Sequence, residues 1–327
     1  MPKISVLGAG GWGMALAISA FNNGCEVTLW SPFENEVNAL LEKRTNEKLL
    51  KDIYLPDGIN ITTDLSCVEG DTLTIIATPS IAVPEVAQKL KEYSNIGIVV
   101  NVSKGFQQGT LKRLSEVIAE ALPDSPVVAL TGPSHAEEVA RNIPTSIVAA
   151  SKSMAAATAV QGIMSSENLR VYTSGDLIGA ELGGALKNVI AVAAGFCDGL
   201  GLGDNSKAAL ITRGLAEMAR LGVCMGAKEY TFAGLTGIGD LVVTCTSQHS
   251  RNNRFGYKIG SGVAIKEALE QVGTVEGYYA ARMAYELSKK YNIEMPIVTE
   301  CYKVLYEDKD INTVVYDLMT RPNGKEH

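Results

Sequence analysis

Three glycines at fixed spacing stand between a short apolar segment and a longer one near the start of the chain. The stretch reads VLGAGGWGMALA and contains Gly8-x-Gly10-x-x-Gly13. The residues before it predict a β-strand and those after it an α-helix. In a strand–turn–helix unit, such glycines allow a tight turn, close approach of the backbone to a pyrophosphate and close helix–sheet packing. This segment therefore predicts a dinucleotide-binding βαβ unit.

Strands and helices continue to alternate through the first half of the chain. Apolar runs predict strands at Lys3–Gly8, Glu26–Trp30, Thr72–Thr78, Ile96–Val102, Val127–Leu130, Thr145–Ala150 and Leu169–Thr173. Helical patterns lie between them at Val83–Tyr93, Thr110–Leu122 and Met154–Met164. The strands are apolar throughout, which is typical of a parallel sheet covered on both faces. We expect an α/β fold with an N-terminal Rossmann-type, doubly wound and mostly parallel sheet.

The strand signal stops at about Asp176. Helical patterns follow at Leu177–Ala194, Asn205–Met225, Ala264–Glu270, Gly277–Tyr291, Pro296–Tyr306 and Ile311–Met319. A chain of 327 residues is long enough for two ordinary domains. We expect a dinucleotide-binding Rossmann domain at 1–175 and an all-helical substrate and catalytic domain at 176–327.

Charge and cysteine usage narrow the class of protein. The net charge of −7 argues against nucleic acid and anionic membranes as partners. The six cysteines show no CxxC spacing, so we expect free thiols in a reducing compartment and a cytoplasmic protein. The uncharged run Ile4–Phe21 is too rich in glycine for a signal peptide. We expect no metal site, because the histidines lie far apart, at His135, His249 and His327.

The segment that opens the second half raises a question about one lysine. LIGAELGGALKNVIAVAAG, residues Leu177–Gly195, carries only two charges, Glu181 and Lys187. Its glycines and Asn188 argue against a membrane span. An ammonium in apolar surroundings is costly unless it is paired or takes part in chemistry. Taken alone, Lys187 fits either a snorkelling side chain whose head reaches water or a catalytic group.

The stretch Gly234–Gly256, GLTGIGDLVVTCTSQHSRNNRFG, is the other polar anomaly. Asp240 follows Gly-Ile-Gly, a flexible approach that places a carboxylate without side-chain crowding. The run Ser250–Arg254 gathers hydroxyl, guanidinium and amide donors in an otherwise acidic chain. Such donors suit a phosphate, and the alternative is a solvated loop.

Six segments, taken in order, resemble the family of NAD(P)-dependent glycerol-3-phosphate dehydrogenases. They are the glycine turn with its tryptophan, NVSKG, LTGPSHAEEV, ALKNVIAVAAG, GIGDLVVTCTSQHSRNNRFG and VEGYYAA. The resemblance runs from about Ile4 to Met319. It implies a homodimer that interconverts dihydroxyacetone phosphate and sn-glycerol 3-phosphate and feeds phospholipid synthesis.

The resemblance also implies roles for individual residues. Lys187 matches the catalytic lysine, which would stabilise and protonate the alkoxide that forms when hydride reaches C2. Asn188 and Thr244 would orient Lys187 and Asp240. The residues expected to contact substrate are Lys104, Gly132, Ser134, Lys187, Asp240, Ser250, Arg251 and Asn252. The residues expected to border the cofactor are Gly8, Gly10, Gly11, Trp12, Gly13, Phe33, Lys104, Ala136, Arg251, Thr274 and Glu276.

Small residues on the helical face of Lys187 suggest room for a ligand. Gly183, Gly184 and Ala191 share that face, and we expect them to let substrate approach closely. Thr274 stands where the family often has valine.

The second strand bears on the choice between NAD and NADP. Its end reads Trp30-Ser31-Pro32-Phe33 and lacks the acid that often holds the ribose hydroxyls. NADPH users of the family carry a basic pair at the positions of Pro32 and Phe33, whereas Glu34 and Glu36 follow here. We expect NADH to be preferred or discrimination to be weak, with NADP as the alternative.

Two other classes of protein remain open. A 3-hydroxyacid dehydrogenase has a similar two-domain build, but its lysine is followed four positions later by asparagine, where this chain has Ala191. A non-catalytic nicotinamide-nucleotide sensor would use the same fold, because fold does not fix function. Such a sensor would have no use for Lys187 together with Asp240.

Overall fold

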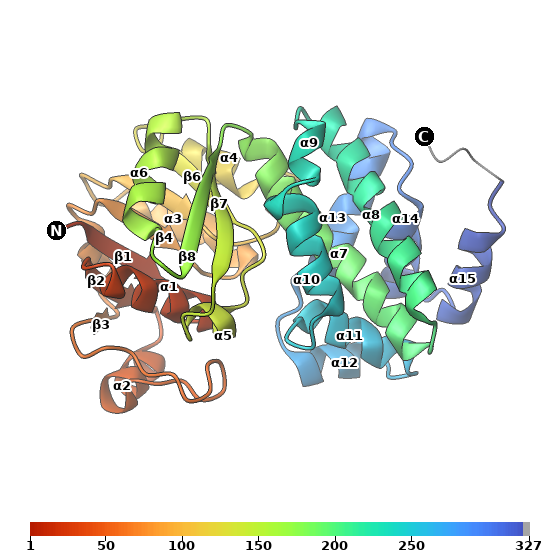
Figure 1. The fold of residues 1–327 in the computed structure, drawn as a ribbon, viewed down its shortest axis with the longest axis horizontal. Coiled ribbons are helices and arrows are strands. Elements are labelled where there is room, and N and C mark those ends of the chain that lie inside the picture. Colours follow the sequence, from red (N-terminus) through yellow and green to blue (C-terminus); the bar gives the residue numbers. More distant parts are fainter. Residues whose placement is uncertain (323–327) are drawn as a thin grey trace. The chain divides into compact units, whose positions relative to one another are not determined.

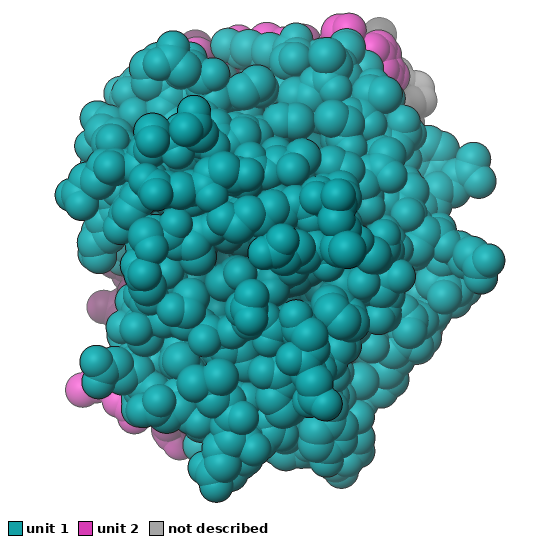
Figure 2. Space-filling view, turned by 90° about the vertical axis from the view of Figure 1, so that its left-hand side faces the viewer, with its two compact units in different colours: residues 1–181 teal, residues 182–327 magenta. Residues whose placement is uncertain are grey.

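The computed structural model describes residues 1–322, shown as a ribbon in Figure 1. The chain divides into two compact units, Met1–Glu181 and Leu182–His327, called unit 1 and unit 2 below. They are coloured teal and magenta in Figure 2. The sequence predicted a boundary between residues 175 and 176, and the units divide a few residues later, inside a helix.

Unit 1 is built on one sheet, which within the described residues has eight strands. They are β1 (Lys3–Leu7), β2 (Glu26–Trp30), β3 (Asn60–Thr62), β4 (Leu73–Ile76), β5 (Ile98–Asn101), β6 (Val127–Thr131), β7 (Thr145–Ser151) and β8 (Leu169–Ser174). Their order is β3-β2-β1-β4-β5-β6-β7-β8. All pairs are parallel except β6 with β7. The order reverses between β1 and β4, so ligands of such sheets bind beside the carboxyl ends of these strands.

Helices cover both faces of this sheet. The helical elements of unit 1 are α1 (Gly11–Asn22), α2 (Glu34–Lys43), η1 (Leu65–Val68), η2 (Ser80–Ala82), α3 (Val83–Leu90), α4 (Leu114–Ala121), α5 (Ala136–Val139) and α6 (Met154–Met164). Apolar residues of α1 and α6 pack in one buried cluster with the sheet, and those of α3 and α4 in another. Two apolar layers explain why the strands are apolar throughout. The predicted fold class is confirmed.

Unit 2 is helical within the residues described. Its elements are α8 (Asp204–Cys224), α9 (Glu229–Phe232), the π-helical turn η3 (Leu235–Gly239), α10 (Asp240–Thr246), α11 (Arg251–Gly260), α12 (Ile265–Val272), α13 (Glu276–Tyr291), α14 (Pro296–Tyr306) and α15 (Ile311–Met319). Helix α7 (Leu177–Gly199) begins in unit 1 and continues into unit 2. It is long and apolar enough to cross a membrane, but 89% of its most apolar window is buried. Such burial is that of a core helix.

Glycines let α7 pack backbone to backbone with its neighbours. A Cβ on Gly195 would lie 2.1 Å from the Asn253 carbonyl oxygen, and one on Gly256 would lie 2.0 Å from that of Val192. A Cβ on Gly183 would lie 2.2 Å from the Thr236 carbonyl oxygen. The expectation that Gly183 opens a path for substrate is therefore wrong, because the backbone of η3 fills that space.

Three of the predicted helices have the observed bounds, namely α6, α14 and α15. Strand β3 was missed because it has three residues, of which only Ile61 is buried. Helices α10 and α11 were also missed. The polar run Ser250–Arg254 is not a solvated loop but the N-cap and first turn of α11.

Candidate active site

The glycine turn follows β1 and lies against the end of β4. Gly8 has a φ of +123°, and a Cβ there would lie 2.7 Å from the Ala77 carbonyl oxygen. A Cβ on Gly13 would lie 1.9 Å from the Gly8 carbonyl oxygen. Side chains at Gly8 and Gly13 would therefore break the turn. A Cβ on Gly10 would meet no atom within 4 Å, so this side of the turn is open to a ligand.

The first turn of α1 is suited to an anion. Its N-cap, Gly10, provides no side-chain hydrogen bond, and the turn holds no acidic residue. The first N–H groups of a helix have no intrahelical partner, and the helix dipole favours negative charge there. Trp12 packs on the core, and the Cβ of Ala136 lies 3.7 Å from where a Cβ on Gly11 would be. The structure thus places Ala136 beside Gly11 in the glycine turn that also contains Trp12, two residues that the family resemblance expects to border the cofactor.

Three expected substrate residues meet beyond the carboxyl ends of β5 and β6. The Lys104 ammonium donates to the Gly132 carbonyl oxygen at 3.1 Å, and the Ser134 hydroxyl donates to the same oxygen at 3.0 Å. Gly132 has a φ of +140°, which a side chain would strain. The three residues therefore form a polar group at the sheet edge that carries the glycine turn.

Two threonines that sequence reasoning missed lie at this same edge. Within the described residues, the buried hydroxyl oxygens of Thr78, just after β4, and Thr131, at the end of β6, have no hydrogen-bond partner. Buried polar atoms are nearly always paired, so we expect these hydroxyls to form hydrogen bonds when a ligand is bound. Together with the uncapped helix and the open glycine, they fit a nicotinamide dinucleotide. The only signal in the sequence is their place at strand ends.

Unit 2 surrounds the lysine of α7 with an acid and a hydroxyl. The Lys187 ammonium donates to the Asp240 carboxylate and, at 2.8 Å, to the Thr244 hydroxyl. That hydroxyl donates to the Asp240 carbonyl oxygen at 2.6 Å. Lys187 is only 6% exposed and Asp240 1%. The lysine head therefore does not snorkel into water but ends in a buried ion pair.

The asparagine beside the lysine faces a different group. The Asn188 side chain accepts a hydrogen bond of 2.9 Å from the Asn252 amide. The side-chain Oδ1 of Asn252 accepts one of 2.8 Å from the backbone N–H of Gly277. This network joins the start of α11 to the start of α13, where Thr274 and Glu276 stand. Asn188 thus supports Asn252 directly, whereas the sequence predicted that it orients Lys187.

Ser250 and Arg251, at the start of α11, differ in whether their side chains are already hydrogen-bonded within the protein. The Ser250 hydroxyl caps the helix by accepting from the Asn253 N–H at 3.2 Å. Arg251 is exposed, and its side chain makes no ion pair or hydrogen bond with the described residues. A free guanidinium at a helix N-terminus is well suited to a phosphate.

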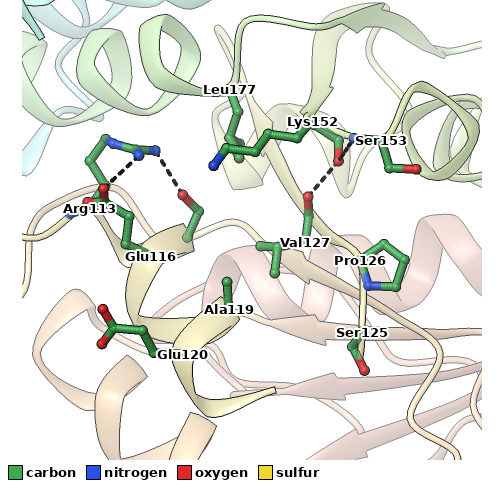
Figure 3. Close-up of a pocket in the computed structure, with 12 residues that line it drawn as sticks. Arg113, Glu116, Ala119, Glu120, Ser125, Pro126, Val127, Lys152, Ser153 and Leu177 are labelled. Atoms are coloured by element: carbon green, nitrogen blue, oxygen red, sulfur yellow. Dashed lines mark hydrogen bonds and ion pairs between the residues drawn. The ribbon is translucent and has the colours of Figure 1, made fainter. Parts of the chain in front are cut away.

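A separate hollow of about 380 Å³ lies at the opposite edge of the sheet, where β6 begins and β7 ends (Figure 3). Arg113 lines it and bonds to Ser115 at 3.0 Å and to Glu181 at 2.6 Å. No residue expected at the cofactor or substrate site lines this hollow. Its residue Arg113 instead neutralises Glu181, one of the charged residues of α7.

A Rossmann unit with an open glycine turn, joined to a helical unit with a buried lysine–aspartate pair, defines a nicotinamide-dependent dehydrogenase of the two-domain type. Comparison with known proteins gives the family. Models of the NAD-dependent glycerol-3-phosphate dehydrogenase N-terminus and C-terminus match residues 3–157 and 176–316. The chain belongs to this family.

Individual relatives match along nearly their full length. The chain is 51% identical to a glycerol-3-phosphate dehydrogenase [NAD(P)+] of Thermoanaerobacter sp. (strain X514), covering 99% of this chain and 98% of that one. It is 49% identical to that of Desulfitobacterium hafniense (strain Y51), covering 100% and 93%. The crystal structure of glycerol-3-phosphate dehydrogenase from Coxiella burnetii matches with a TM-score of 0.94 at 39% identity, covering 98% and 99%.

Proposed function

We propose that this chain interconverts dihydroxyacetone phosphate and sn-glycerol 3-phosphate with a nicotinamide cofactor. The observation that carries the proposal is the buried ion pair of Lys187 and Asp240, with Thr244 on the same ammonium. A buried charge pair is costly to build, so its presence in a chain that also holds a dinucleotide fold calls for a chemical task.

Lys187 performs the acid–base step. The bound cofactor supplies or accepts a hydride. In the reducing direction, the Lys187 ammonium stabilises the oxyanion that develops at C2 and gives it a proton. Asp240 and Thr244 fix the ammonium through the hydrogen bonds described above. Asn188 acts through Asn252, which it holds in place.

The phosphate is bound by the start of α11. Arg251 offers a free guanidinium, and Ser250 and Asn252 stand on either side of it. Lys104, Gly132 and Ser134 supply further polar contacts to the substrate. Arg251, Thr274 and Glu276 also border the cofactor.

The cofactor is held by the glycine turn, Trp12, Ala136 and Lys104, with Phe33 beside the adenosine. Phe33 is 62% exposed at the N-cap of α2, directly after β2. An exposed aromatic ring there is available to lie against adenine. We expect NADH to be preferred over NADPH, since acidic rather than basic residues follow β2 and a carboxylate there would repel a 2′-phosphate. We also expect a cytoplasmic homodimer that supplies glycerol phosphate for phospholipid synthesis.

A substrate panel tests the function. Oxidation of NADH is followed by absorbance with dihydroxyacetone phosphate, with a 3-oxoacid and with no substrate. Rapid oxidation with the ketose phosphate alone is the expected result. Turnover of the 3-oxoacid instead would identify a hydroxyacid dehydrogenase, and NADH binding without any turnover would identify a sensor.

A further inference from the structure

The glycine turn is bonded directly to the end of β2. The N–H of Gly8 donates to the Trp30 carbonyl oxygen at 2.9 Å. The residue after Trp30 therefore lies beside the turn where the dinucleotide is bound. In many Rossmann folds an acid at this point accepts hydrogen bonds from the adenosine ribose. This chain has Ser31 there instead.

The hydroxyl of Ser31 is hydrogen-bonded to an acidic side chain, that of Glu36, at the end of β2. Ser31 is 1% exposed, and its oxygen accepts a hydrogen bond of 3.3 Å from the Phe33 N–H. The hydroxyl proton is donated to Oε2 of Glu36, in the first turn of α2. This hydrogen bond holds the Glu36 carboxylate at the end of β2, although the Glu36 backbone lies further along the chain, in α2.

The second oxygen of this carboxylate remains available. Within the part of the chain that the structure describes, Oε1 of Glu36 makes no hydrogen bond or ion pair, and the residue is half-buried. A carboxylate oxygen accepts up to two hydrogen bonds. It can therefore receive ribose hydroxyls while Oε2 stays on Ser31.

Two bases stand at the end of α2, and the second of them, Arg44, is already committed. The Arg44 guanidinium donates to the carbonyl oxygens of Leu55, Pro56 and Ile59. Those bonds fold the segment after α2 rather than leaving a cation for a phosphate. Lys43 stands in the last turn of this ten-residue helix, about 13 Å along the axis from its start.

We infer that Glu36 binds the adenosine ribose and excludes the 2′-phosphate of NADPH, with Ser31 as its positioning residue. This rests on the proposed use of a nicotinamide dinucleotide. It assigns the selection of NADH to one carboxylate rather than to the acidic character of α2 as a whole.

Equilibrium binding separates these two explanations. Dissociation constants for NADH and NADPH are measured by fluorescence titration without substrate, for the wild type, Glu36→Gln and Glu34→Gln. Glu36→Gln should weaken NADH by about 10-fold, as for one lost charge-assisted hydrogen bond, and should move the NADPH/NADH ratio towards unity. Glu34→Gln removes the same charge two positions away and should change the ratio by less than about 2-fold.

Ser31→Ala supplies the test of positioning. It should weaken NADH by less than Glu36→Gln does, and adding it to Glu36→Gln should have little further effect. Unchanged binding in Glu36→Gln, equal shifts in both glutamine variants, or tighter binding of NADPH by the wild type would overturn the inference. If NADH binds as expected but dihydroxyacetone phosphate is not reduced, the proposed function fails while this inference stands. If dihydroxyacetone phosphate is reduced but Glu36→Gln binds NADH as tightly as the wild type does, this inference fails while the proposed function stands.

Discussion

The three charges of α7, those of Glu181, Lys187 and Asp198, are each neutralised by a different partner, and Asp198 pairs with Lys207 at 2.5 Å. Glu181 pairs with Arg113 and accepts from the Ser115 N–H at 2.8 Å, while Lys187 pairs with Asp240. Removing one member of a buried pair typically costs about 3–5 kcal/mol, because the other charge is left unpaired. The Glu181 pair anchors the start of the helix, whereas the Lys187 pair carries an ammonium that chemistry can use.

At Arg251 we predict a loss that depends on the phosphate. Arg251→Ala should raise the KM for dihydroxyacetone phosphate about 30–100-fold, as for a lost charged hydrogen bond pair, and should affect unphosphorylated dihydroxyacetone far less. Arg251→Lys should recover only part of the loss, because an ammonium lacks the planar fork of donors. Steady-state kinetics with both substrates give the answer, and equal losses for both would assign Arg251 to the cofactor alone.

Among the elements, α14 takes its cap from another helix. Glu217 of α8 accepts hydrogen bonds from the N–H groups of Ile297, at 2.8 Å, and Val298, at 3.2 Å. Burial raises the pKa of this carboxyl to about 7, against an ordinary value of about 4.3. The raised pKa means that the fold favours the protonated form.

Unfolding should therefore depend on pH through Glu217. Its contribution to stability is fully present below about pH 4.3 and is lost as pH rises through about 7, by up to about 4 kcal/mol. Urea unfolding between about pH 5 and pH 8 should show a steeper fall for the wild type than for Glu217→Gln, which cannot ionise. Parallel pH profiles for the two proteins would contradict this assignment.

The contact between α7 and α11 makes a second prediction at this scale. Gly256→Ala places a methyl group against the Val192 carbonyl oxygen and should destabilise the protein by about 1–3 kcal/mol. Gly162→Ala is the matched control, because Gly162 is exposed within α6 with nothing near its Cβ. That change should stabilise by up to about 1 kcal/mol. Denaturant unfolding compares them, and a neutral Gly256→Ala would contradict the close contact.

For the whole molecule, local sequence patterns predicted the secondary structure and fold class better than they predicted the side-chain contacts between elements. The glycine turn, the apolar strands and the lone Lys187 are properties of short segments, so the sequence alone reveals them. Other features depend on folding. They are the unpaired hydroxyls of Thr78 and Thr131, the hydrogen bond between Asn188 and Asn252, and the hydrogen bond from Ser31 to Glu36. Side chains that meet through a turn or from different elements leave no periodic signal in the sequence. Helix α11 was missed for a related reason, because a capping serine followed by polar residues also describes a loop.

The central claim is that Lys187 is the proton donor of a dihydroxyacetone phosphate reductase. The turnover number of Lys187 variants, compared with that of the wild type, tests this claim most directly. Lys187→Ala should lower kcat for NADH-dependent reduction by about 10²–10⁴-fold and leave the Kd for NADH nearly unchanged. Lys187→Arg is the control for folding and charge, because it keeps a cation for Asp240 but cannot release a proton. It should be folded, as judged by thermal unfolding, and equally slow. Near-normal turnover in either folded variant would contradict the claim and return Lys187 to a structural role.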